Sequence, residues 1–237
     1  MGRISEARGS GSWYPAGLLA CGVCVDEATV VSEYARLWWE HKTSTMVPGT
    51  YLGVPCWQQP NDAWITQEII SETRPEVIVE CGRLGGGSTI MWAHLLEILE
   101  IDGLVVSIEL RDVPLGVEDR SIWKRRVWPI TGRSSVDEEV VEEVRRLSEG
   151  RRTMVILDSD HSQAHVEKEL AAYAPLVSPG CYMIVQDGFV SMVDPDHGPG
   201  PYEATQTFLA GDERFEVDHG RERLIHTLNP SGFLRRR

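Results

Sequence analysis

The chain has 237 residues, enough for one α/β domain with a substantial hydrophobic core. Its formal net charge of −13 argues against nucleic acid as a partner, because a phosphate-binding face needs clustered Lys and Arg. No apolar run reaches the roughly 18 residues that a membrane-crossing helix needs, so no integral membrane segment is expected.

The first 25 residues are expected to form an irregular arm. Residues 16–25 are apolar and follow Arg3 and Arg8, a weak likeness to a secretory signal peptide that Glu6 interrupts. A segment that docks onto a neighbouring subunit or a membrane surface explains the pattern equally well, and the sequence leaves this choice open. We expect residues 1–45 to form an arm and a helix on the oligomer or substrate side of a main domain over 46–237. We also expect a homo-oligomer.

The five cysteines, at positions 21, 24, 56, 81 and 181, do not form a disulfide framework. Cys81 and Cys181 lie in apolar runs typical of strands and are interpreted as reduced core residues, which predicts a cytoplasmic location. Cys21 and Cys24 lack a second pair for zinc and lack a preceding strand, so we attribute their spacing to chance.

The next segments lead to the first strand of the main domain. Asp26 is placed to cap a helix over 27–42 that carries apolar side chains along one side. Residues 43–60 form a long loop rich in Pro, Gly and aromatic side chains, and Tyr51 and Trp57 argue against disorder. We expect this loop to fold over a functional site, and a helix over 62–70 to follow it.

A β-branched run at 77–79 predicts a buried parallel strand, with Glu80 at its carboxyl end. Gly82 and the three glycines at 85–87 then make a turn that lets backbone approach a ligand closely. Ser88 follows, and the apolar segment 89–99 predicts a helix. A strand, a glycine loop and a helix in this order form the first half of a nucleotide-type site in a doubly wound sheet.

The second strand, 104–108, ends in Glu109, an acid placed to accept both hydroxyls of a ribose. The glycine spacing is not the dinucleotide pattern G-x-G-x-x-G, because position 84 is Leu, and Glu80 would repel a pyrophosphate. These features disfavour a nicotinamide-dependent oxidoreductase. They favour the S-adenosylmethionine (SAM) loop of class I methyltransferases, with Glu80 facing the ligand's amino group. A glycine-rich turn without a ligand is the simpler alternative.

The remaining elements continue the alternation of strands and helices after a polar segment at 110–126. Further strands are expected at 127–131, 153–157 and 180–185, helices at 135–147, 161–173 and 201–209, and a closing antiparallel pair at 214–217 and 223–228. This order predicts a Rossmann-like, doubly wound, mostly parallel sheet with an antiparallel C-terminal edge.

The ends of the fourth and fifth strands are unusually polar. Asp158 follows one strand, and Gln186 and Asp187 follow the next. Adjacent parallel strands would bring the two carboxylates together beside the glycine loop, where two carboxylates and an amide oxygen suit Mg²⁺. Alternatively, Asp158 or Asp160 merely caps the following helix.

Two histidines, His161 and His165, lie one helical turn apart and raise the alternative of a zinc site. No Glu stands between them in the H-E-x-x-H position, and no third His or Cys is near in sequence, so zinc is disfavoured. His161 lies at the ligand end of the sheet and is placed to act as a general base. His165 is expected at the surface of its helix.

Six motifs together carry a resemblance to a known family. They lie at 51–57, 80–88, 156–161, 186–187, 198–204 and 229–234. This ordered, collinear set resembles the cephalosporin hydroxylase / rhamnosyl O-methyltransferase family from about Lys42 to the C-terminus. Nothing in the chain resembles a redox site.

The resemblance implies a class I SAM-dependent fold, Mg²⁺ beside the methyl donor, and O-methylation of a hydroxyl on a sugar or another natural product. The acceptor would be a small-molecule glycoside, such as a rhamnose-like deoxysugar. By the same resemblance Asp158 and Asp187 match metal-ligating carboxylates, and His161 matches a proposed base. The SAM-binding residues would be Glu80, Gly82, Gly86, Ser88, Glu109, Ser134 and Asp158.

Position 186 departs from the family, which usually has Glu where this chain has Gln. As a metal ligand, Gln186 would contribute an amide oxygen and no charge, so weaker metal binding is expected. The same substitution supports a second hypothesis, a SAM-binding accessory protein without methyl transfer activity.

Overall fold

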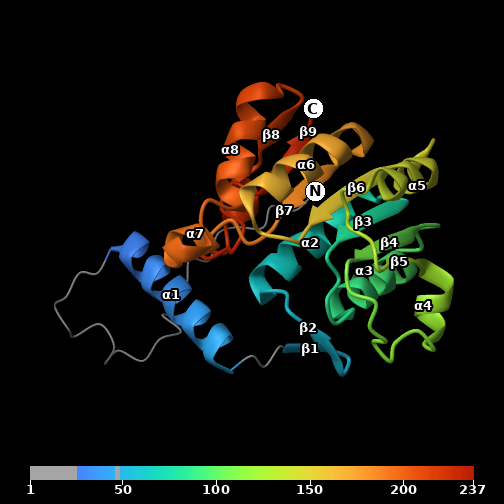
Figure 1. Ribbon diagram of the computed structural model, residues 1–237, viewed down its shortest axis with the longest axis horizontal. Coiled ribbons are helices and arrows are strands. Elements are labelled where there is room, and N and C mark those ends of the chain that lie inside the picture. Colours follow the sequence, from blue (N-terminus) through green and yellow to red (C-terminus); the bar gives the residue numbers. More distant parts are fainter. Residues whose placement is uncertain (1–25, 46–48) are drawn as a thin grey trace, which may run out of the picture.

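The computed structural model describes residues 26–45 and 49–237, so the predicted arm over 1–25 and the loop positions 46–48 lie outside the described residues. Within the described part, the molecule is built on a seven-stranded sheet in the order β5-β4-β3-β6-β7-β9-β8 (Figure 1). The strands are β3 Val77–Cys81, β4 Leu104–Glu109, β5 Val127–Thr131, β6 Thr153–Leu157, β7 Tyr182–Val185, β8 Phe215–Val217 and β9 Phe233–Arg236. Strands β3 to β7 pair in parallel, and β9 pairs antiparallel with both β7 and β8. The predicted fold is confirmed.

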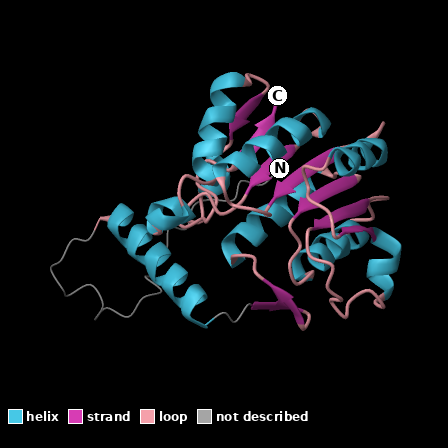
Figure 2. Cartoon of the chain, in the orientation of Figure 1, coloured by secondary structure: helices cyan, strands magenta, loops and turns pink. Residues whose placement is uncertain are grey.

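Helices surround the sheet, and a two-stranded ladder lies apart from it and contacts α3 (Figure 2). The helices are α1 Glu27–Thr45, α2 Pro60–Thr73, α3 Gly87–Ile98, α4 Ser121–Arg126, α5 Glu138–Ser148, α6 Gln163–Tyr173, α7 Val190–Val193 and α8 Pro201–Gly211. Short 3₁₀ turns occupy Ala174–Leu176, Pro195–His197 and His219–Glu222. The ladder pairs β1 Gly49–Tyr51 with β2 Val54–Cys56, inside the segment predicted as an irregular loop.

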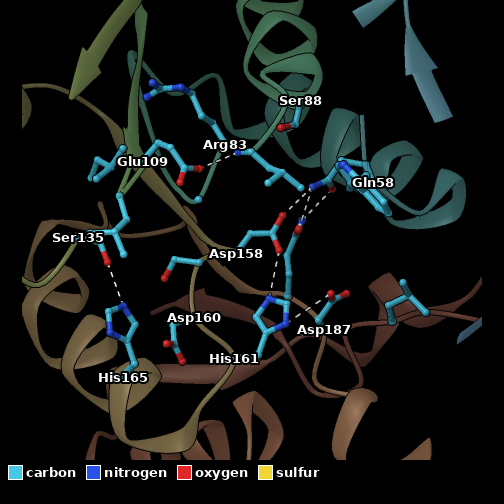
Figure 3. A pocket seen from close by; sticks show the side chains of 18 of the residues that line it. Gln58, Arg83, Ser88, Glu109, Ser135, Asp158, Asp160, His161, His165 and Asp187 are labelled. Atoms are coloured by element: carbon cyan, nitrogen blue, oxygen red, sulfur yellow. Dashed lines mark hydrogen bonds and ion pairs between the residues drawn. The ribbon is translucent and has the colours of Figure 1, made fainter. Parts of the chain in front are cut away.

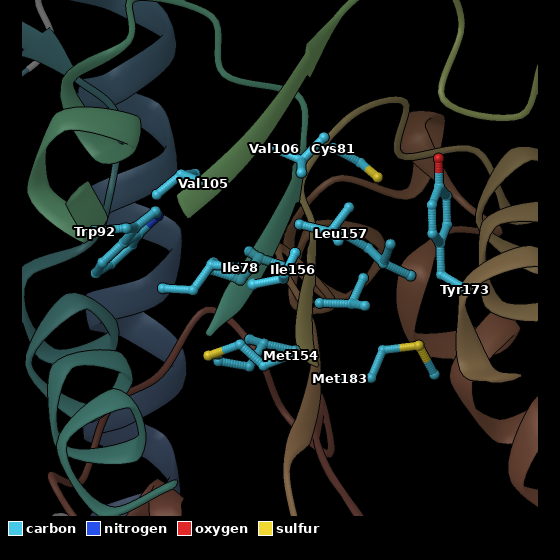
Figure 4. Close-up of a cluster of buried hydrophobic side chains, with 14 of the residues drawn as sticks. Ile78, Cys81, Trp92, Val105, Val106, Met154, Ile156, Leu157, Tyr173 and Met183 are labelled. Carbon is cyan, nitrogen blue, oxygen red and sulfur yellow. The ribbon is translucent and has the colours of Figure 1, made fainter. Parts of the chain in front are cut away.

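The strands form because β-branched and other apolar side chains are buried on both faces of the sheet. Ile78 of β3 and Ile156 of β6 have no exposed surface, as expected for central parallel strands. Trp92 of α3 and Tyr173 of α6 are also fully buried and lie on opposite sides of these strands (Figure 4). The core therefore fixes where each strand ends, and the loops after those ends form the functional site.

The closing strand pair differs from the prediction in one member. β8 lies where a strand was expected, but its partner is β9, Phe233–Arg236, and residues 223–228 are not a strand. Phe233 and Leu234 are fully buried beside β7, whereas Ile225 is 67% exposed with φ of +70°. Burial of Phe233 and Leu234 decides which segment joins the sheet, since an exposed segment gains little from pairing there.

The polar segment before β5 also contains an element that the sequence did not predict. Ser121–Arg126 forms the short helix α4, which buries Ile122 and Trp123 against the body. Its two buried side chains are too few to give a helical pattern in the sequence, and packing on α3 stabilises the turn.

The first described helix, α1, lies beside the body and contacts the short helix α7 (Figure 1). Ala35, Trp38 and Trp39 on one side of α1 pack with Phe189 and with Leu228 in a small second core. None of the described helices is long and apolar enough to cross a membrane.

Candidate active site

A cavity of about 840 Å³ opens at the carboxyl ends of the parallel strands. Loops after β3, β4, β5, β6 and β7 contribute to its wall, together with the loop before α2 and Trp39 of α1. This position is where open α/β sheets bind ligands, and the volume is typical of a small-molecule site. The predicted location of the site is therefore the location of the cavity.

The glycine loop after β3 forms one end of the cavity. Gly82 has φ of +87°, and a Cβ on it would lie 1.9 Å from the carbonyl oxygen of Asp158. The loop and the end of β6 thus touch through bare backbone, which only glycine allows. Ser88, in the first turn of α3, also lines the cavity.

Glu109 lies at the end of β4, facing the glycine loop (Figure 3). One carboxylate oxygen accepts from the Leu84 backbone N–H at 2.9 Å, and the other from the Arg111 backbone N–H at 3.0 Å. Each oxygen keeps a further lone pair, and the residue lines the cavity although it is 8% exposed. Two fixed acceptors in this position suit the paired hydroxyls of a ribose.

A buried arginine that the sequence did not predict also lines this end of the cavity. The Arg83 guanidinium donates to the Ser107 and Ile130 carbonyl oxygens and to the Thr131 hydroxyl. Burial lowers the pKa of Arg83, and nearby Glu109 opposes that shift. Arg83 thus connects the glycine loop to β4 and β5, through contacts that sequence spacing does not reveal.

Glu80 lies behind the cavity wall instead of lining it. Its carboxylate, 1% exposed, accepts from the Thr89 hydroxyl and from Trp92 Nε1, the latter at 2.9 Å. Burial raises the pKa of Glu80 to about 7, although these hydrogen bonds oppose the shift. Gly86 also lies away from the cavity, where a Cβ would meet Leu115 Cδ1 at 2.9 Å. Both residues hold the start of α3 in place.

At the other end of the cavity, His161 lies between two carboxylates (Figure 3). Its Nε2 is 3.5 Å from Asp158 Oδ1, and its Nδ1 is 3.8 Å from Asp187 Oδ2. One ligand atom from each of these three side chains lies within 4.8 Å of the others, a spacing that could hold a metal ion. The predicted convergence of Asp158 and Asp187 follows from the pairing of β6 with β7.

Gln186 lies beside this cluster, and its amide pairs with the amide of Gln58. Gln58 Nε2 donates to Gln186 Oε1, and Gln186 Nε2 donates to Gln58 Oε1, both at 2.9 Å. Gln58 Nε2 also lies 3.1 Å from Asp158 Oδ2. Gln58 belongs to the loop that was predicted to fold over the site, and Trp57 and Gln59 of the same loop also line the cavity.

A buried network after β7 shapes the backbone of Asp187. Asp187 has φ of +56°, and its N–H donates to Asn229 Oδ1 at 3.0 Å. Asp62, at the start of α2, accepts from the Leu228 N–H at 2.8 Å and from the Thr227 hydroxyl. Burial raises the pKa of Asp62 to about 6, against the effect of these bonds. Asn229 belongs to a motif that carried the family resemblance, but its contact with Asp187 was not predicted.

The side wall of the cavity carries a further polar cluster beside the predicted SAM residue Ser134. The Ser135 hydroxyl contacts His165 Nε2 at 3.1 Å and Glu169 Oε1 at 2.5 Å. Glu169 has no exposed surface, and its hydrogen bond to His165 raises the pKa of that imidazole. His165 was predicted to be a surface residue, but it lines the cavity. It does not join His161 in a shared metal site.

The sheet order, the cavity at the strand ends and the Glu109 acceptor beside a glycine loop define the class I methyltransferase fold. Solved structures agree with this assignment. The chain aligns with CmcI solved without ligand at a TM-score of 0.60 and 22% identity, covering 81% of this chain and 77% of that one. The O-methyltransferase TomG from Streptomyces achromogenes, solved with SAM, aligns at a TM-score of 0.52 and 20% identity, covering 84% of both chains.

Sequence comparison identifies the family. Residues 44–237 match the family described as Rhamnosyl O-methyltransferase/CmcI, and the chain belongs to that family. It is 32% identical to the rhamnosyl O-methyltransferase of Mycobacterium tuberculosis (strain ATCC 25618 / H37Rv), over 86% of this chain and 84% of that protein. The rhamnosyl O-methyltransferase of Mycobacterium leprae (strain TN) is 29% identical, over 88% and 91% respectively. The predicted family resemblance is confirmed.

Proposed function

We propose that this protein transfers a methyl group from SAM to a hydroxyl of a sugar or a related natural product, with Mg²⁺ beside the reacting groups. The observation that carries the proposal is one cavity in which a ribose-type acceptor, Glu109, and a carboxylate–histidine cluster lie at opposite ends. Mycobacterial relatives named rhamnosyl O-methyltransferase support a rhamnose-like acceptor. A CmcI structure described as holding Mg and SAM supports the two cofactors.

The residues at the glycine-loop end fit SAM. Gly82, Ser88, Glu109, Ser134 and Asp158 all line the cavity, and the bare backbone of Gly82 lets the glycine loop pack directly against the end of β6. Glu109 would accept the ribose hydroxyls through lone pairs that its backbone donors leave open. Glu80 would act indirectly, by fixing α3 from behind Ser88, instead of touching the ligand's amino group as the sequence predicted.

The residues at the other end fit Mg²⁺. Asp158 and Asp187 provide the hard oxygen donors that this ion prefers. An imidazole nitrogen is a poorer Mg²⁺ ligand, so we assign His161 the role of general base. When bound, SAM supplies a methyl group on a positively charged sulfur, and Mg²⁺ supplies positive charge beside the acceptor oxygen.

The chain's own residues would then activate the acceptor hydroxyl. An alcohol is a weak nucleophile near neutral pH, so a base must take its proton as the oxygen attacks the methyl carbon. The His161 ring would accept that proton, and the flanking carboxylates of Asp158 and Asp187 would stabilise the imidazolium. Trp39 and Trp57 line the cavity and would pack on the acceptor and exclude water.

The test is a reaction of the purified protein with SAM and Mg²⁺ against a panel of rhamnosides and other deoxysugar glycosides, read by mass spectrometry. The expected result is an acceptor whose mass rises by one methylene unit, with an equal amount of S-adenosylhomocysteine. Asp187→Asn serves as the inactive comparison. SAM binding in calorimetry without a mass shift across the panel would instead favour the accessory protein without methyl transfer.

The cellular setting and assembly are part of the proposal. The described cysteines Cys56, Cys81 and Cys181 are buried free thiols, which supports a reducing compartment such as the cytoplasm. Several apolar side chains of α1, including Tyr34 and Leu37, are exposed. They support the expectation that α1 forms the contact surface of a homo-oligomer. Light scattering of the purified chain tests the second point.

A further inference from the structure

Gln58 and Gln186 form an amide pair at the end of the cavity that holds Asp158, His161 and Asp187, which we call the metal end. Gln186 is 4% exposed and follows β7, whereas Gln58 comes from the loop before α2. Each amide donates one hydrogen bond to the other at 2.9 Å. A reciprocal pair of this kind satisfies one donor and one acceptor of each side chain.

One atom of the pair, Gln58 Nε2, contacts the Asp158 side chain of the metal end. Gln58 Nε2 donates to Asp158 Oδ2 at 3.1 Å as well as to Gln186 Oε1. The other carboxylate oxygen, Asp158 Oδ1, faces His161 Nε2 at 3.5 Å (Figure 3). Gln58 therefore donates a hydrogen bond to one oxygen of the Asp158 carboxylate, and His161 lies against the other.

The chemistry of the pair requires an amide at both positions. If position 186 carried a carboxylate, Gln58 Oε1 would face an acceptor and would lose the N–H that it now receives from Gln186. The Gln186 oxygen in turn receives an N–H, so one of its two lone pairs is already used, and a cation on the other would lie beside the positive hydrogen of that donor. Both amides are thus occupied with each other.

We propose that Gln58 is a positioning residue that sets the direction of the Asp158 carboxylate toward the metal, and that Gln186 acts through Gln58 and is not itself a metal ligand. This inference rests on the proposed function, because it assumes a divalent cation on Asp158 and Asp187. It explains how a chain with Gln at position 186 keeps an ordered metal end. The Gln58–Gln186 pair is uncharged, whereas a carboxylate at position 186 would add a third negative charge beside Asp158 and Asp187.

The test measures metal binding directly, by electron paramagnetic resonance titration of Mn²⁺, which prefers the same oxygen ligands as Mg²⁺. The variants are Gln58→Met, Gln186→Met and the double variant. Methionine keeps the unbranched shape, removes the hydrogen bonds and is a poor ligand for these hard ions. Each single variant should lose Mn²⁺ affinity roughly tenfold, a typical effect of removing an outer partner of a metal ligand.

The double variant decides between the two roles of Gln186. If the amides act as one unit, the double variant should bind Mn²⁺ within about twofold of the weaker single variant. If Gln186 binds the metal directly, its loss should exceed that of Gln58→Met, and the two losses should multiply. That outcome overturns the inference, as does unchanged affinity in Gln58→Met.

The controls separate this inference from the proposed function. Gln163→Met removes an amide whose hydrogen bond goes to Glu167 on α6, so it should leave Mn²⁺ affinity unchanged. Thermal unfolding of each variant without metal identifies any that fails to fold, in which case Gln58→Ala and Gln186→Ala replace the methionine variants. Wild-type protein that binds no Mn²⁺ overturns both the inference and the metal part of the proposed function. Wild-type binding with unchanged Gln58→Met overturns the inference alone.

Discussion

The two ends of the cavity are constructed differently. At the glycine-loop end, neighbouring strand ends and the start of α3 supply most of the wall, and backbone N–H groups hold Glu109. At the metal end, side chains far apart in sequence hold one another. Gln58 contacts Asp158 from 100 residues away, and Asn229 contacts the backbone of Asp187 from 42 residues away. Backbone geometry therefore determines the shape of the glycine-loop end, and side-chain amides determine how the groups of the metal end are held.

This difference has consequences for how each end responds to change. Substitutions at the glycine-loop end should alter folding or SAM affinity, because they act on the backbone framework itself. Substitutions at the metal end should alter turnover while the framework persists, because the groups involved are side chains supported by loops. Four substitutions, taken from the largest expected effect to the smallest, test this division.

Replacing His161 with Ala should lower turnover on the order of 10²–10⁴-fold and leave SAM affinity nearly unchanged, because its proposed role is proton transfer. Single-turnover kinetics and calorimetry of SAM binding measure the two effects. His219→Ala removes an exposed histidine outside the cavity and is the matched control. Turnover within a few-fold of the parent would assign the proton to water or another side chain.

Replacing Gly82 with Ala should destabilise the fold by more than ~3 kcal/mol, since the new Cβ meets a carbonyl oxygen in a strained backbone conformation. Gly53→Ala is the control, because Gly53 has φ of +82° and a Cβ added to it would meet no atom within 4 Å. That variant should lose only about 1–2 kcal/mol from backbone strain. Urea unfolding measures both, and equal losses would show that close approach at Gly82 is unimportant.

Replacing Glu80 with Gln should remove a pH dependence of stability. Burial raises the pKa of Glu80 from an ordinary 4.5 to about 7, so the folded state favours the neutral acid. Its stabilising contribution is present below pH 4.5 and is lost as the pH rises through about 7, at a cost of roughly 3 kcal/mol by pH 8. Urea unfolding can be measured from about pH 5 to about pH 8, a range that spans this transition. The parent should lose stability over that range, and Glu80→Gln should lose less.

An exposed acid provides the control for that pH series. Glu149 lies at the surface after α5, and Glu149→Gln should leave the parent's pH dependence unchanged. If Glu80→Gln follows the parent through the whole series, the carboxyl group is ionised in the folded protein. The raised pKa described for Glu80 would then be wrong.

Replacing Glu109 with Ala should weaken SAM binding about tenfold or more, because it removes two hydrogen bonds to a charged acceptor. Calorimetry of SAM binding measures the loss. Glu118→Ala is the control, since Glu118 also accepts a backbone N–H, from Leu115 at 2.7 Å, but lies exposed outside the cavity. Unchanged affinity in Glu109→Ala would move the ribose to another part of the cavity.

The amino-acid sequence by itself determined most of the framework. β-branched runs such as that of β3 are long enough and apolar enough to identify buried parallel strands. Parallel strands end at one edge of a sheet, so the residues after them, including Glu109, Asp158 and Asp187, can be assigned to one site from their positions in the chain. The glycine loop was equally clear, because its conformation demands glycine.

The tertiary structure alone decided which side chains hold these groups. Gln58 and Gln186 are 128 residues apart, and no local pattern links two amides across that distance. Glu80 was expected to face the ligand, but its side chain turns toward Trp92 behind the wall, a choice made by packing of α3 on the sheet. Phe233 and Leu234, not residues 223–228, form the last strand pair because only they can be buried beside β7. Strand positions follow from local residue patterns, whereas partners and burial depend on how distant segments pack.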